Sequence, residues 1–182
     1  VTVVQMLWIN IIMDTLGGLA FAGEAPLESY MQEPPKRRDE PILCHYMINE
    51  IIFGGCATIA LCIAFLKVPE ITSVFRASSD NICLLTGFFA LFIFASVFNC
   101  FNARTDRLKL LSGITKNHAF ILIMAAVLAV QIIFVYLGGS VLRTVPLTAR
   151  ELGVTAVLAL LVFPAEFIRK LVWRLFFGKR GY

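Results

Sequence analysis

Five long apolar runs dominate this chain, and each comes close to the length that crosses a lipid bilayer. The hydrocarbon core of a bilayer is about 30 Å thick, which requires roughly 20 apolar residues in a helix. The runs cover about residues 3–23, 43–66, 82–102, 119–138 and 152–171. Hydrophobic residues make up 59% of the chain and its mean hydropathy is +0.83, values that soluble domains rarely reach. The sequence therefore predicts an all-α, polytopic membrane protein with five transmembrane helices.

The connections between the runs alternate in basic charge. Twelve of the 16 basic residues lie in the connections 24–41 and 103–118 or in the C-terminal end at 169–180. The other side of the membrane receives only Lys67, Arg76, Arg143 and Arg150. Basic connections remain on the cytoplasmic side of a membrane. We therefore expect both basic connections and the C-terminus in the cytoplasm, and the N-terminus outside.

The first apolar run is interpreted as a spanning helix and not as a signal peptide. It contains Asp14, it lacks a small-residue cleavage site, and four further spans follow it. An outside N-terminus without a leader predicts that further sequence precedes Val1. The net charge of +4 follows from the charge bias of the connections, so the expected partner is the lipid bilayer and not a nucleic acid.

Two polar residues interrupt the first apolar run, in the segment WINIIMDTLGG at 8–18. An aspartate at the centre of a membrane helix costs about 2.5–3.5 kcal/mol on insertion scales, and such residues often mark an ion path. Asn10 and Asp14 are four residues apart and share one helix face. Calcium takes six to eight oxygen ligands, of which this pair supplies only a part. The remaining ligands must come from other helices, backbone carbonyls or water.

Other interpretations of Asn10 and Asp14 stay open on residue types alone. The pair could be a polar clasp between helices, or Asp14 could serve a proton relay. Gly17 and Gly18 follow at once and permit either close helix approach or local unwinding, which would free carbonyls near the site. No second carboxylate lies at the depth of Asp14, so a complete calcium cage is not expected from these five helices.

The remaining polar residues of the apolar runs are expected to have structural roles. Gln131 is predicted to make an interhelical hydrogen bond. Asn99 and Asn102 are predicted to cap or tie a helix end. Glu166 precedes Arg169 and Lys170 by three and four residues, so an interfacial ion pair is predicted there. The first helix therefore remains the candidate site, because structural roles are predicted for the polar residues of the other helices.

The segment QMLWINIIMDTLGGLAFAGE, residues 5–24, resembles the sixth membrane helix of P-type calcium-transporting ATPases, most closely the plasma-membrane type (type IIB). EPPKRRDEPIL at 33–43 resembles that family's loop between helices six and seven. FNCFNAR at 98–104 resembles the end of helix eight, and QIIFVYLGG at 131–139 resembles helix nine and its exit. The resemblance implies that residues 1–182 form the C-terminal transmembrane domain, helices six to ten.

The resemblance also implies roles for single residues. The family's sixth helix supplies an Asn and an Asp to the transported ion, and these positions match Asn10 and Asp14. Members that carry two calcium ions have a Thr before the Asp, where this chain has Met13. They also have a Glu in helix eight, where this chain has Ser96. With both differences, the chain resembles the plasma-membrane type, a one-calcium pump. The remaining ligands would lie in helix four, outside this chain.

The sequence contains no DKTG motif and no phosphate-binding loop, so no residue receives a catalytic or cofactor-binding role. The resemblance implies a parent enzyme that is a P-type calcium-transporting ATPase of the plasma membrane. Calcium would be its transported ion, and ATP and magnesium would act only through domains missing here. The expected partners are the missing N-terminal helices and cytoplasmic domains of that pump. Two alternatives stay open: a non-catalytic, truncated membrane module or assembly partner, and a pump for another cation or for protons.

Overall fold

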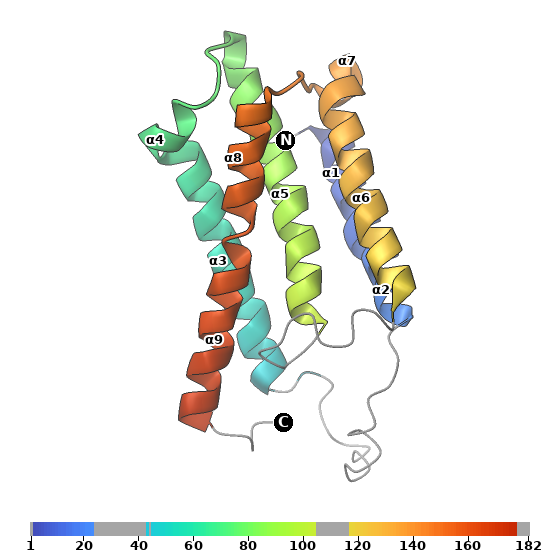
Figure 1. Ribbon diagram of the computed structural model, residues 1–182, viewed down its shortest axis with the longest axis vertical. Coiled ribbons are helices and arrows are strands. Elements are labelled where there is room, and N and C mark those ends of the chain that lie inside the picture. Colours follow the sequence, from blue (N-terminus) through green and yellow to red (C-terminus); the bar gives the residue numbers. More distant parts are fainter. Residues whose placement is uncertain (1, 24–42, 44, 105–116, 178–182) are drawn as a thin grey trace.

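The computed structural model describes residues 2–23, 43, 45–104 and 117–177 (Figure 1). All regular secondary structure of these residues is helical. Five helices are long and apolar enough to cross a membrane, so the predicted all-α, five-helix membrane fold is confirmed. The five spans are Val3–Ala22, His45–Lys67, Ile82–Ala103, His118–Leu137 and Ala149–Phe176.

The first span is one continuous rod made of three consecutive segments. These are α1 (Val3–Asn10), the π-helical segment η1 (Ile11–Gly17) and α2 (Gly18–Ala22). A capping box starts it: Thr2 accepts a hydrogen bond from the backbone of Gln5, and the Gln5 side chain accepts one from the backbone of Thr2. The rod lies beside α6 (His118–Leu137) along its length (Figure 1).

Helix α5 (Ile82–Ala103) forms the centre of the bundle and contributes more buried side chains than any other described helix. Two apolar clusters lie on different sides of it. One joins α5 to the first span and α6 through residues such as Ile12, Phe89 and Met124. The other joins α5 to α3 (His45–Lys67) and to the fifth span. Burial of both faces explains why α5 is apolar all round.

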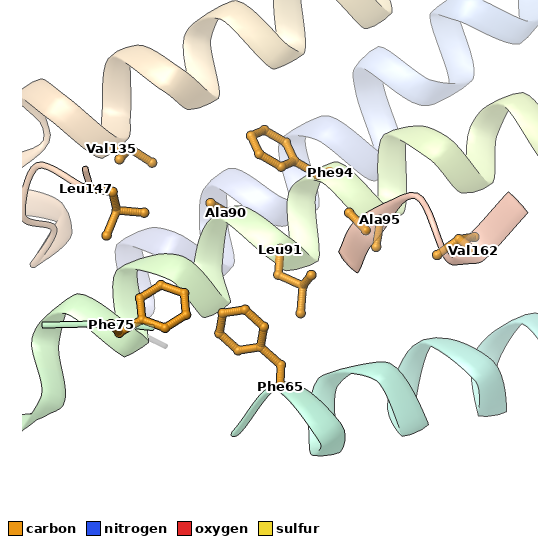
Figure 2. Packing of buried hydrophobic residues seen from close by; sticks show 10 residues of the cluster. Phe65, Phe75, Ala90, Leu91, Phe94, Ala95, Val135, Leu147 and Val162 are labelled. Atoms are coloured by element: carbon orange, nitrogen blue, oxygen red, sulfur yellow. The ribbon is translucent and has the colours of Figure 1, made fainter. Parts of the chain in front are cut away.

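The second cluster includes a residue from a connection as well as residues from helices. Phe75 lies between α3 and α5 in the chain, and its ring packs edge-on against Phe65 with centroids 5.2 Å apart (Figure 2). Leu91 of α5 and Val162 of the fifth span lie further along the same cluster. The connection after α3 is therefore fixed to the bundle core.

The fifth span differs from the single helix expected at 152–171. It begins at Ala149 and is divided into two helices, α8 (Ala149–Ala159) and α9 (Val162–Phe177). Pro164 explains the division, because it has no N–H to donate to the carbonyl of Leu160. That carbonyl accepts instead from the backbone N–H of Phe163 at 3.0 Å, which tightens the turn.

Three short helices lie at one end of the bundle: α4 (Pro69–Thr72), η3 (Ser79–Asn81) and α7 (Gly139–Leu142). Figure 1 shows α4 and α7 at the end opposite to the C-terminal end of α9. Arg76 fixes the α4 connection there, because its side chain bonds both carboxylate oxygens of Glu151 and the carbonyl of Pro146. The connections at this end are thus tied to α8.

Candidate cation site in the first membrane helix

The predicted site falls on the one π-helical segment of the described chain. Residues Ile11–Gly17 keep right-handed backbone angles, but their hydrogen bonds follow the wider i→i+5 pattern. Such segments are rare and frequently occur at functional sites. The structure shows neither of the two effects that Gly17 and Gly18 permit, local unwinding and close helix approach. Neither glycine is unwound, and a Cβ atom on either would meet no other described helix within 4 Å.

Asn10 ends α1 directly before the π-helical segment. Its side chain is exposed and has no hydrogen-bond partner among the described residues. It lies on the wall of a groove of about 490 Å³ between the first span, α3 and α5. The other groove-lining residues are apolar or weakly polar: Met6, Ile9, Thr58, Ile59, Cys62, Ile63, Leu66, Phe88 and Phe92. The amide of Asn10 is therefore available to a ligand or to a further polar group.

The backbone of Asp14 lies within the π-helical segment. The side chains of Asp14 and Met13 lie outside the described part of the structure. The prediction that Asn10 and Asp14 present oxygen atoms to one point therefore stays a prediction. The donor types fit a hard cation, because an amide oxygen and a carboxylate are both oxygen ligands.

The polar residues of α5 nearest the groove already have partners. The Ser96 hydroxyl donates to the carbonyl of Phe92 at 2.8 Å within its own helix. Asn99 donates from Nδ2 to the hydroxyl of Thr58 at 3.2 Å, and this hydroxyl donates to the carbonyl of Gly54 at 2.9 Å. Asn99 thus ties α5 to α3, as predicted.

Gln131 makes the predicted interhelical hydrogen bond, and its partner is in the first span. The indole Nε1 of Trp8 donates to Gln131 Oε1 at 3.2 Å. The Trp8 ring also packs edge-on against Phe134, with centroids 4.8 Å apart. Two further contacts join the ends of the span to the same region. Gln5 Nε2 donates to the carbonyl of Leu142 at 2.7 Å, and Asn117 Nδ2 donates to the carbonyl of Ala20 at 3.4 Å.

The predicted ion pair of Glu166 is present and belongs to a larger buried cluster. Glu166 binds Arg169 through two contacts and lies 3.5 Å from Lys170 Nζ. Arg169 also reaches α3, where it donates to the hydroxyl of Tyr46 at 3.1 Å. Glu50 Oε1 lies 3.7 Å from the guanidinium. The cluster joins the first turns of α3 to α9. Its carboxylates, Glu50 and Glu166, lie in ion pairs with the basic residues of α9.

Asn102 ties the end of α5 to the fifth span, as predicted. Its Nδ2 donates to the carbonyl of Val162 at 3.3 Å, and its own carbonyl accepts from Lys170 Nζ at 2.8 Å. A cation at this position is favourable because the carbonyls at a helix C-terminus carry partial negative charge. Among the described residues, no group of three His, Cys, Asp or Glu side chains is arranged to hold a metal ion.

Two contacts escaped the sequence reasoning. The first is the identity of the Gln131 partner, Trp8, whose hydrogen bond attaches the candidate helix to α6. Trp8 stands in an apolar run, where an indole is usually read as apolar surface, and its partner is 123 residues away. The second is the contact of Arg76 with Glu151, residues 75 positions apart. Only the fold brings these residues together, and it buries the Glu151 carboxylate beside Arg76.

Comparison with known proteins identifies the family. The family model for the cation transporting ATPase C-terminus matches residues 1–172. A plasma-membrane-type calcium-transporting ATPase 5 of Oryza sativa subsp. japonica is 36% identical over 174 residues, which cover 93% of this chain and 16% of the relative. A plasma-membrane-type calcium-transporting ATPase 12 of Arabidopsis thaliana is 34% identical over 173 residues, covering 94% of this chain and 16% of the relative.

A fungal relative gives the same result. Calcium-transporting ATPase 2 of Cryptococcus neoformans var. grubii is 32% identical over 169 residues, covering 90% of this chain and 12% of the relative. The chain therefore spans about a sixth or less of the length of these relatives. The family match agrees with the order of the motifs and with the five apolar helices. This multi-pass membrane chain therefore belongs to the family of C-terminal domains of cation-transporting P-type ATPases.

Proposed function

We propose that residues 1–182 are the C-terminal transmembrane domain of an ATP-driven calcium pump of the plasma-membrane type. In this proposal, Asn10 and Asp14 supply part of the oxygen shell of the transported calcium ion. The observation that carries the proposal is the unpartnered amide of Asn10, which stands at the start of a π-helical segment that contains Asp14. The calcium-transporting relatives support calcium as the ion, in place of another cation or protons.

The rest of the pump would complete the site and drive it. Phosphorylation, ATP binding and magnesium binding would belong to domains outside this chain, as would the further ion ligands. The groove beside Asn10 gives such ligands room, since it is open and lined mainly by apolar side chains. In this proposal the basic end of the bundle faces the cytoplasm, together with the C-terminus.

The test is Asp14→Asn in the full-length pump. This change keeps the size of the side chain but removes the charge that a calcium ion requires. We expect calcium-dependent phosphorylation by ATP to be abolished. Asp80→Asn is the matched control, because Asp80 is an exposed carboxylate outside the predicted spans and undergoes the same chemical change. Normal phosphoenzyme at ordinary calcium in the Asp14 variant would refute the proposed site.

A second measurement separates loss of the site from loss of the fold. Phosphorylation by inorganic phosphate in the absence of calcium reports on a folded pump without an occupied ion site. We expect it to persist in the Asp14→Asn variant. Loss of both reactions would mean that the variant is misfolded. Asn10→Ala then tests the proposed site, because this change leaves the charge of the helix unchanged.

A further inference from the structure

The contacts of the first span differ sharply between its two faces. Gln5 and Trp8 are three residues apart, so they share a face, and both donate hydrogen bonds toward α6 and α7. Asn10 follows Trp8 by two residues, which turns it by about 200° around the helix axis. It therefore points away from α6 and onto the groove formed with α3 and α5.

From this arrangement, we infer that Trp8 and Gln131 are positioning residues for the cation site. The hydrogen bond between them sets the rotation of α1, and this rotation holds the Asn10 amide on the groove wall. The inference rests on the proposed function, since it assumes that Asn10 meets the transported ion. It assigns to α6, which carries no ion ligand in the proposal, the task of orienting the helix that does.

The burial of Gln131 supports a specific role for its amide. The side chain is fully buried, and its Nε2 has no hydrogen-bond partner among the described residues. A buried amide with an unpaired donor is costly compared with an apolar side chain of similar size. Leu at this position would therefore suit packing better. Within the described ranges the amide has one partner, the indole of Trp8, so orientation of the first span is the benefit that this contact offers.

The position of the contact along the span also matters. Trp8 lies one turn before the π-helical segment, and Asn117 holds the far end of the span at Ala20. The segment Ile11–Gly17 thus lies between two points of attachment to the α6 region. Because both ends are held, a change in the backbone of the segment leaves the span attached to α6.

The experiment uses two single variants and their combination in the full-length pump. Trp8→Phe keeps an aromatic ring against Phe134 and removes the indole N–H. Gln131→Leu removes the acceptor. We expect each to raise the free calcium concentration for half-maximal phosphorylation about two- to tenfold, the range of one net hydrogen bond. Phosphorylation by inorganic phosphate without calcium should stay unchanged. A merely structural defect would lower the amount of this phosphoenzyme.

The double variant tests whether the two residues act as one unit. Each single change leaves one polar atom of the contact unpaired, whereas the double change leaves neither partner behind. We therefore expect the double shift to be smaller than the product of the two single shifts. Shifts that simply multiply would overturn the positioning role, because the residues would then act independently.

Thr155→Val is the matched control. Thr155 is fully buried in α8 and donates to the carbonyl of Glu151 at 2.8 Å, far along the chain from the first span. We expect no shift in the half-maximal calcium concentration for this variant. If the Trp8 and Gln131 variants also show none while Asp14→Asn abolishes phosphorylation, the inference is wrong and the proposed function stands. If Asp14→Asn keeps its calcium dependence, the proposed function fails and the inference fails with it.

Discussion

The Arg169 guanidinium and the Glu166 carboxylate form a two-pronged ion pair within α9. Nε and Nη2 of Arg169 lie 2.8 and 2.5 Å from the two carboxylate oxygens. Only 3% of the Arg169 side chain and 6% of the Glu166 side chain are exposed. The same guanidinium lies 4.7 Å from the ring centroid of Tyr46 in α3. One intrahelical pair thereby fixes the contact between two helices.

The first prediction concerns this pair. Glu166→Gln leaves the buried charges of Arg169 and Lys170 with less compensation. Removing one partner of a buried pair costs about 3–5 kcal/mol, because the remaining charge keeps its desolvation penalty. We expect a clear fall in the thermal unfolding midpoint of the detergent-solubilised pump, measured with a dye that reacts with newly exposed thiols.

Glu50→Gln is the comparison for this prediction. Glu50 belongs to the same cluster, but 24% of its side chain is exposed and it lies 3.7 Å from Arg169. Its removal should lower the midpoint by less, since water partly screens the charge. An equal fall in both variants would show that burial does not set the energy of this cluster.

The second prediction concerns the close approach of α5 to the connection after α3. A Cβ atom on Gly87 would lie 2.8 Å from Cζ of Phe75 and 3.2 Å from Cζ of Phe65, closer than the packing allows. Gly87→Ala should therefore destabilise the bundle by about 1–3 kcal/mol, the usual cost of overpacking. The measurement is the unfolding midpoint, as above.

Gly55→Ala supplies the control for Gly87. Gly55 lies inside α3, and a Cβ atom there would meet nothing within 4 Å. Alanine is the better helix former by about 1 kcal/mol, so this variant should be neutral or slightly stabilised. The same fall in both variants would mean that backbone freedom, and not the Phe75 ring, explains the glycine.

The sequence was sufficient for the helices because membrane spans follow from length and hydropathy alone. It also predicted the ion pair of Glu166, since charged residues inside apolar runs require partners. The break at 160–161 was missed because hydropathy alone joins residues 152–171 into one span, although Pro164 indicates the break. The partner of Gln131 could not be found from the sequence, because only tertiary packing places Trp8 beside it.

The π-helical segment shows a different limit of the sequence. The two adjacent glycines permitted unwinding or close approach, whereas the structure has a wider, π-helical hydrogen-bond pattern there with right-handed angles at both glycines. Local propensity does not distinguish these outcomes, because glycine permits all of them. Beyond the segment the span packs along α6, where the ring centroids of Phe21 and Phe120 are 5.7 Å apart.

The third prediction concerns the tie between Arg76 and Glu151. The carboxylate also accepts hydrogen bonds from the backbone and the hydroxyl of Thr148 at 2.7 and 2.9 Å, so it caps α8. Arg76→Gln should loosen the α4 connection while the cap persists. Glu151→Gln should disturb both, and it should therefore lower the unfolding midpoint more.

The pH dependence of this tie follows from the arginine. The hydrogen bond and the charge of Glu151 raise the pKa of Arg76 above its ordinary value. A cation whose pKa is raised by folding contributes its stability at every pH below the ordinary value, and loses it only as the pH rises through the raised one. The difference between the original protein and Arg76→Gln should therefore be constant across the neutral range. A difference that vanishes on mild alkalinisation would contradict the pairing.

The last prediction concerns the orientation of the bundle in the membrane. Glu70 of α4 and Arg174 near the end of α9 are both exposed, and they lie at opposite ends of the bundle. Basic residues accumulate at the α9 end, which should therefore face the cytoplasm. In intact cells, a membrane-impermeant maleimide should label the full-length pump with Glu70→Cys, whereas Arg174→Cys should react only after the cells are permeabilised. The unsubstituted pump gives the background, since Cys56 is exposed in α3. Labelling of Arg174→Cys in intact cells, with Glu70→Cys protected, would show that the orientation is the reverse.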